Sequence, residues 1–152
     1  MENYYSEIPE LKYHLNNPMM ERICELKERG YEEKDTVDYA PQDYADALDS
    51  YERVLEICGE ITGQIIAPNA EGVDAEGPHC ANGRVDYASG TKENLKATVK
   101  AGLNGMTMPR RFGGLNFPIT PYTMCAEIVA AADAGFSNVY PKYWIYFMSL
   151  SM

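Results

Sequence analysis

An apolar repeat that begins after Pro41 and continues to Pro68 constrains this chain most strongly. Its members recur at alternating spacings of four and three residues, at Tyr44, Leu48, Tyr51, Leu55, Cys58, Thr62 and Ile65. This period places them on one face of a helix, which gains most of its stability by packing that face. The sequence therefore predicts a long helix in a helical bundle, ended by Pro68. Gly59 and Gly63 each cost about 1 kcal/mol in a helix, so we expect a neighbouring helix to approach closely there.

Other segments also carry helix signals. Residues 18–29, 91–101 and 120–135 each begin with a capping residue or a proline and reach a glycine at their end, and a shorter helix is expected over 7–15. The predicted inward-facing residues are Met19, Ile23 and Leu26 in the first, Leu95, Thr98 and Val99 in the second, and Cys125, Ile128, Val129 and Ala132 in the third. Because no segment has the pattern of a parallel sheet, the predicted fold class is all-α, a helical bundle.

Residues 67–90 lack a helical period and contain the dipeptide Asn82-Gly83. Both central residues of a type I′ turn need a positive φ, so this dipeptide predicts a small β-hairpin near residues 79–86. The same region holds five potential metal ligands, namely Asp74, Glu76, His79, Cys80 and Asp86. Their spacing matches neither a zinc pattern nor a calcium-binding loop, so we interpret them as surface residues and expect no metal site.

The net charge of −10 lies in the first half of the chain. Residues 1–76 contain 19 acidic and 6 basic side chains, whereas residues 77–152 contain 4 and 7. Because negative proteins are not attracted to phosphate backbones, nucleic acid is excluded as a partner, and the acidic half is interpreted as a solvated face. The chain has no signal-peptide pattern and no apolar run near the ~18 residues of a membrane span. We therefore expect a cytoplasmic location, with the cysteines as buried free thiols at Cys24, Cys58, Cys80 and Cys125.

No catalytic residues stand out. His14 and His79 are the two histidines, and neither belongs to a Ser/His/Asp or Cys/His arrangement. The loop over residues 102–114 lacks the glycine patterns that cradle phosphates. Arg110 and Arg111 in this loop could hold an anionic ligand, but two loop arginines are more often solvated, and we prefer the solvated interpretation.

The same loop carries a family resemblance. The motifs are Ala101-Gly102-Leu103, Gly105-Met106, the run from Pro109 to Leu115, Ala126-Glu127-Ile128-Val129 and the run from Ala132 to Gly135. In this order and spacing, after a long helix, they resemble the N-terminal domain of acyl-CoA dehydrogenases, over roughly residues 11–138. The resemblance implies that residues 1–139 form a helical domain. In the complete enzyme this domain would pack beside a middle β-domain and a C-terminal four-helix domain.

In that family, FAD and the acyl-CoA thioester lie between the domains, and the complete enzyme is a homo-oligomer. A carboxylate base removes a proton from Cα while the flavin accepts a hydride from Cβ, which gives the 2,3-enoyl-CoA. The helix that matches residues 122–134 lines the acyl chain, so the resemblance implies Glu127, Ala131 and Gly135 as substrate-binding positions. It assigns no catalytic residue to this chain and leaves the cofactor-binding residues unknown. We expect the chain alone to retain no FAD and to be inactive.

The resemblance ends near Tyr140. Residues 140–152 carry one charge and include Tyr143, Trp144 and Tyr146, unlike the family's continuation. We expect this apolar tail not to pack natively and to result from a truncated or frameshifted reading frame. Two alternatives stay open. The chain could be a non-catalytic helical module that docks a partner chain through its tail, or one half of a split enzyme completed by a separately encoded partner.

Overall fold

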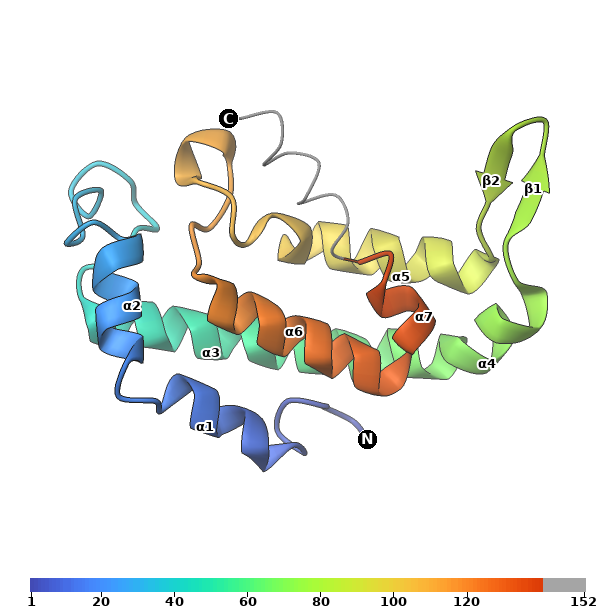
Figure 1. Ribbon diagram of the computed structural model, residues 1–152, viewed down its shortest axis with the longest axis horizontal. Coiled ribbons are helices and arrows are strands. Elements are labelled where there is room, and N and C mark those ends of the chain that lie inside the picture. The colour runs from blue at the N-terminus through green and yellow to red at the C-terminus, as the bar shows by residue number, and fades with distance from the viewer. Residues whose placement is uncertain (141–152) are drawn as a thin grey trace.

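The computed structural model describes residues 1–140, which form helices and one small β-hairpin. The elements are η1 (Pro9–Leu11), α1 (Lys12–Leu15), α2 (Met20–Lys27), α3 (Tyr44–Ile61), η2 (Thr62–Ile66), α4 (Ala67–Glu76), β1 (His79–Ala81), β2 (Arg84–Asp86), α5 (Ser89–Lys100), η3 (Leu103–Gly105), η4 (Arg110–Phe112), α6 (Ile119–Ala132) and α7 (Ala134–Ser137). Helices α3, α5 and α6 run along the molecule, and α2 crosses one end (Figure 1). The predicted class, an all-α bundle with a small hairpin, is confirmed.

Helix α3 supplies much of the core. Tyr51, Leu55 and Cys58 are buried as predicted, whereas Leu48 and Ile65 are only partly buried. The Tyr51 ring meets Phe117 edge to face, with the ring centroids 4.6 Å apart. This burial explains why α3 holds the bundle together: its apolar stripe contacts α6 along its length.

The prediction that Pro68 ends the long helix is wrong. The backbone passes through the π-helical turn η2 and continues as α4, with Pro68 in the first turn. A proline in a continuous α-helix would clash with the carbonyl four residues earlier, at Gln64. The wider turn avoids this clash, and the Ala67 N–H bonds the Thr62 carbonyl five residues back. Residues 67–76, predicted to be non-helical, are therefore α4.

The two glycines of the long helix lie under a closely packed neighbour, as predicted, but this neighbour is the N-terminal segment before η1 and not a helix. A Cβ on Gly59 would lie 2.6 Å from the Tyr5 nitrogen, and one on Gly63 would overlap the Glu2 carbonyl. The Tyr4 N–H donates to the Gly59 carbonyl at 3.2 Å. The absence of side chains at these positions lets the N-terminal segment pack directly on the helix backbone.

Of the predicted inward residues of α2, only Ile23 packs against the core. Met19 and Leu26 are 60% and 61% exposed, whereas Met20 and Cys24 are buried. The buried face continues to Glu28, which is 4% exposed because it pairs with an arginine. A prediction that places only apolar residues in the core cannot identify a buried helix face that includes a charged side chain.

Helix α5 shows the same effect. Val99, predicted inward, is 61% exposed, Leu95 is partly buried, and the buried positions include Asn94 and Thr98. The Asn94 side-chain carbonyl accepts a hydrogen bond from the Asn69 amide of α4 at 2.9 Å. This bond satisfies the Asn94 side-chain carbonyl, whereas its Nδ2 atom is buried without a partner among the described residues. The polar side of α5 therefore faces α4.

The hairpin forms where it was predicted. His79 pairs with Asp86 and Ala81 with Arg84, in antiparallel register. Asn82 and Gly83 have φ values of 52° and 73°, as a type I′ turn requires. The hairpin projects from the end of the molecule where α4 ends and α5 begins (Figure 1).

The predicted tail lies almost entirely outside the described residues, including Tyr143, Trp144 and Tyr146. Its first residue, Tyr140, is described and is 2% exposed. The Tyr140 hydroxyl donates to the Leu103 carbonyl at 3.4 Å. The folded unit therefore includes Tyr140.

Candidate functional site

The predicted substrate-binding residues lie on the outer side of α6 and in α7. Glu127, Ala131 and Gly135 are all exposed. On the opposite side of α6, Cys125 and Ile128 are completely buried and belong to the core. Helix α6 thus has one face fixed by packing and another that is free to contact something else.

The predicted end of this helix at Gly135 is wrong. Helix α6 stops at Asp133, which has extended backbone angles (φ −148°, ψ 95°), and Gly135 lies within α7. The Asp133 Oδ1 atom accepts a hydrogen bond from the Phe136 N–H at 2.8 Å and so caps α7. This change of direction separates Gly135 from Glu127 and Ala131, which stay on α6.

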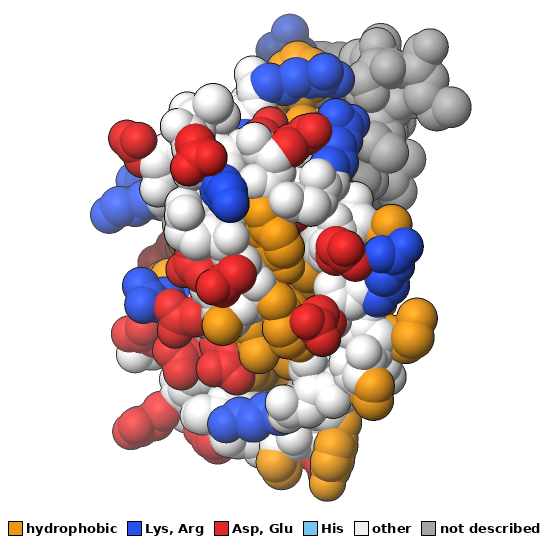
Figure 2. Space-filling model, turned by 90° about the vertical axis from the view of Figure 1, so that its left-hand side faces the viewer, with side chains coloured by type: hydrophobic (Ala, Val, Ile, Leu, Met, Phe, Trp, Pro, Cys, Tyr) orange, Lys and Arg blue, Asp and Glu red, His pale blue; other side chains and the backbone are white. Residues whose placement is uncertain are grey.

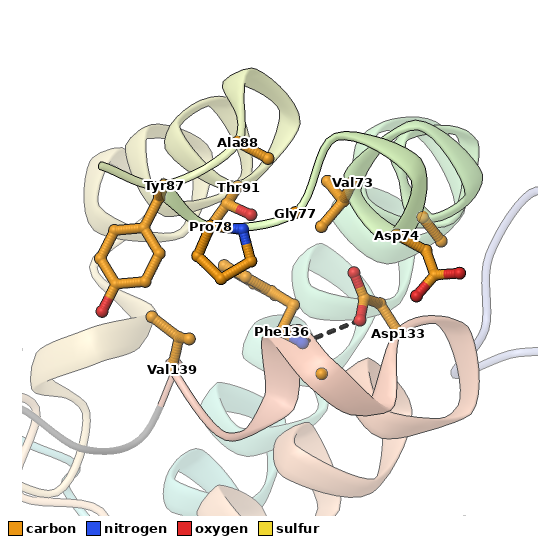
Figure 3. A pocket seen from close by; sticks show the side chains of 12 residues that line it. Val73, Asp74, Gly77, Pro78, Tyr87, Ala88, Thr91, Asp133, Phe136 and Val139 are labelled. Carbon is orange, nitrogen blue, oxygen red and sulfur yellow. Dashed lines mark hydrogen bonds between the residues drawn. The ribbon is translucent and has the colours of Figure 1, made fainter. Parts of the chain in front are cut away.

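Gly135 contributes to a pocket of about 340 Å³ between the end of α4, the base of the hairpin, the start of α5 and α7. Figure 3 shows the Asp133 carboxylate extending from the junction of α6 and α7 toward the end of α4. The apolar part of the lining is Val73, Pro78, Ala88, Phe136 and Val139. Neither Glu127 nor Ala131 lines this pocket. Of the three predicted positions, this pocket therefore contains Gly135 alone within its described lining.

Two close contacts hold the walls of this pocket. A Cβ on Gly90 would lie 2.7 Å from Val73 Cγ2, so the start of α5 packs directly on α4. The Glu76 carboxylate accepts hydrogen bonds from the Ser89 N–H and hydroxyl, the latter at 2.8 Å. These bonds keep the pKa of Glu76 below its usual value. The donors of Ser89 in the first turn of α5 are therefore already bonded to a carboxylate of the same chain.

The prediction that the loop arginines are solvated is wrong for Arg110. Its guanidinium donates to both oxygens of Glu28, at 2.6 and 2.9 Å, and to Glu33 at 2.9 Å. The side chains of Arg110 and Glu28 are each 2% exposed. Arg111 is exposed and lies over the Phe112 ring, 4.8 Å from its centroid. Arg110 is committed to joining η4 to α2 and is not free for an anionic ligand.

The five potential metal ligands do not converge. Asp86 pairs with Lys92 at 2.6 Å, and Glu76 is held by Ser89. Within residues 1–140, no group of three or more His, Cys, Asp or Glu side chains could hold a metal ion. Nor does any helix of these residues have the length and hydrophobicity needed to cross a bilayer.

The four cysteines are free thiols, and three of them are buried. Burial raises the pKa of Cys24, and the Cys58 contact together with burial raises that of Cys125. Cys80 is exposed on β1, so the expectation of burial is wrong for this residue. Its position in a two-stranded hairpin leaves both faces of the strand in solvent.

Two pockets of the described residues do not suit the diphosphate of FAD. A flavin diphosphate needs arginine or lysine side chains or a free helix N-terminus. The 340 Å³ pocket has Asp74 and Asp133 in its described lining and neither Lys nor Arg. A second, open pocket beside α2 has Glu21, Glu25 and Asp43 in its lining, and its Arg22 is paired with Glu25. Figure 2 shows acidic side chains gathered on the face at this end of the molecule. Both pockets would repel the diphosphate.

The polar atoms of the 340 Å³ pocket come from residues that the sequence did not single out. Asp133 and Thr91 belong to different helices, 42 residues apart in the chain. The only local signal is an aspartate shortly before a glycine at the end of an apolar helix, which is typical of a new helix cap. Thr91 was identified only as the first residue of a predicted helix.

Comparison with known proteins gives one informative similarity. No family model matches the chain. Over 89 residues the chain is 34% identical to the 3-methylmercaptopropionyl-CoA dehydrogenase of Ruegeria pomeroyi. That stretch is 59% of this chain and 15% of the relative. The relative is named as an acyl-CoA dehydrogenase, so this similarity supports a relationship with that family.

Proposed function

We propose that residues 1–139 are the N-terminal helical domain of an FAD-dependent acyl-CoA dehydrogenase, an enzyme that oxidises acyl-CoA to 2,3-enoyl-CoA. The observation that carries the proposal is the 34% identity over 89 residues to an acyl-CoA dehydrogenase. The ordered motifs and the all-α fold support it. The enzyme acts in the cytoplasm as a homo-oligomer, and the buried free thiols agree with a reducing compartment.

In this proposal, the outer face of α6 forms one wall of the acyl-chain site. Ala131 is small and leaves room for an alkyl chain, and Glu127 lies one turn away on the same exposed face. The buried side of α6 fixes this wall through Cys125 and Ile128. The chain's contribution is therefore to shape the site and exclude water, while other domains hold FAD and the catalytic base.

The direct test uses the purified 152-residue chain. We expect no flavin absorbance to remain with the protein through gel filtration, and no acyl-CoA-dependent reduction of an artificial acceptor. One wall cannot hold the reacting groups in a productive geometry. Clear turnover by the chain without added protein would overturn the proposal.

The gene neighbourhood provides the second test. A separately encoded neighbour with a β-domain and a C-terminal helical domain would identify the chain as half of a split enzyme.

A non-catalytic interaction module is the competing function, and exposed apolar side chains favour it. Val99 and Ile119 are 61% and 58% exposed. Such side chains mark contact surfaces when they are contiguous. Saturable binding of a partner chain that carries neither a flavin nor a catalytic domain would favour this module over the enzyme domain.

A further inference from the structure

The 340 Å³ pocket contains a carboxylate oxygen that lacks a hydrogen-bond donor among the described residues. This atom is Oδ2 of Asp133, which is buried without such a partner, while Oδ1 caps α7. Thr91, which is 5% exposed, also lines the pocket. Buried polar atoms in folded proteins are normally paired, so each exception needs an explanation. A bound molecule that brings a donor would supply the missing partner.

The charge of the pocket lining indicates which kind of hydrogen-bond donor a ligand would bring. Asp74 and Asp133 are acidic, and the described lining contains no lysine or arginine. The nearby Lys92 is paired with Asp86 on the hairpin at 2.6 Å. A site with uncompensated carboxylates attracts cations and repels carboxylates and phosphates. The ligand of this pocket is therefore not the anionic part of an acyl-CoA.

The remaining lining selects an apolar body. Phe136 and Val139 form one wall, Val73 and Pro78 another, and the Tyr87 ring borders the opening (Figure 3). The volume of about 340 Å³ lies at the small end of ligand-binding pockets. It suits a single ring or a short alkyl chain. Aromatic faces also attract cations, which adds to the effect of the carboxylates.

We propose that this pocket binds a small organic cation, a protonated amine on an apolar body. The ammonium group donates to Asp133 and to the Thr91 hydroxyl, and the apolar body packs on Phe136 and Val139. This site includes Gly135, one of the three positions that the family resemblance implies, but it uses neither Glu127 nor Ala131 and needs no flavin, so it can be tested apart from the acyl-CoA dehydrogenase proposal. It gives the chain a ligand specificity of its own.

The test titrates the ¹⁵N-labelled chain with three probes that share one ring and differ in charge: benzylamine, benzyl alcohol and benzoate. We expect benzylamine to shift the amide signals of Gly77, Thr91 and Gly135 saturably. Benzyl alcohol should bind more weakly, and benzoate should leave these signals unchanged. The order of the three probes reports the charge preference without any mutation.

Two variants and one control assign the contacts. Asp133→Asn keeps an oxygen that can cap α7 but removes the charge, and should weaken benzylamine binding about tenfold or more. Thr91→Val removes the hydroxyl at similar shape and should weaken binding by about threefold. Asp38→Asn is the matched control, since it makes the same substitution at an exposed aspartate outside the pocket. It should leave the affinity unchanged, and far-UV circular dichroism verifies the fold of each variant.

Three results would overturn the proposal: no saturable shift with benzylamine, equal shifts with benzoate, or unchanged affinity in a folded Asp133→Asn variant. If that variant does not fold, Thr91→Val and the probe series decide. Retention or loss of FAD bears only on the proposed enzyme function, so the two proposals fail separately.

Discussion

Replacing Arg110 by Met tests whether the buried ion pair joins η4 to α2. The substitution keeps much of the apolar bulk and removes all three charged hydrogen bonds to Glu28 and Glu33. The Glu28 side chain, 2% exposed, would then keep only the Asn116 amide at 3.4 Å. Removing one partner of a buried pair costs about 3–5 kcal/mol, because the other charge is left uncompensated. For a chain of this size, that lowers Tm by roughly 6–20 °C.

Thermal unfolding followed by circular dichroism measures this loss, and the neighbouring arginine provides the control. Arg111→Met removes an equal charge from an exposed position and should change stability by at most about 0.5 kcal/mol. A double variant that also carries Glu28→Met should recover much of the loss, since an apolar pair of similar volume often replaces a buried ion pair without penalty. Equal Tm values for the Arg110 and Arg111 variants would refute the reasoning.

Two further predictions concern the core and its response to pH. Leu55→Ala should destabilise the fold by about 2–5 kcal/mol in urea denaturation, because Leu55 is completely buried. Ile57→Ala, at a 43% exposed position of the same helix, should destabilise it far less. Equal losses of stability would show that the wrong face of the helix was identified. Burial, with Glu52 and Glu56 nearby, raises the pKa of Tyr5 to about 12. The neutral phenol therefore stabilises the fold below about pH 10, and this stabilisation is lost as the pH rises toward 12. Tyr5→Phe should therefore lose less stability than the parent chain between about pH 9 and about pH 11, and an identical loss would contradict this assignment.

The sequence correctly predicted those elements that are determined by residues close together in the chain. The spacing from Tyr51 to Cys58 predicts the buried stripe of α3, and Asn82-Gly83 predicts the hairpin turn. The errors come from distant partners. The inward face of α2 includes Glu28 because Arg110, 82 residues later, neutralises it. No pattern within one helix contains that information.

The candidate site was likewise predictable only in part from the sequence. The family resemblance indicated the α6 wall, and Gly135 does line a pocket. The polar atoms of that pocket come from Asp133 and Thr91, which the fold brings together from separate helices. Asp133 becomes prominent only because the chain changes direction there and leaves Oδ2 without a partner.

The π-helical turn η2 determines how α4 is rotated about the helix axis relative to α3. A residue advances an α-helix by about 100°, so the additional residue in this turn rotates α4 relative to α3 by that angle. One continuous rod thus presents an apolar stripe to α6 at one end and Asn69 to α5 at the other. Deleting one residue from Thr62–Ile66 would restore the α-helical phase and turn Asn69 away from Asn94. The bundle could keep its packing while the hairpin and the pocket lost their alignment with it.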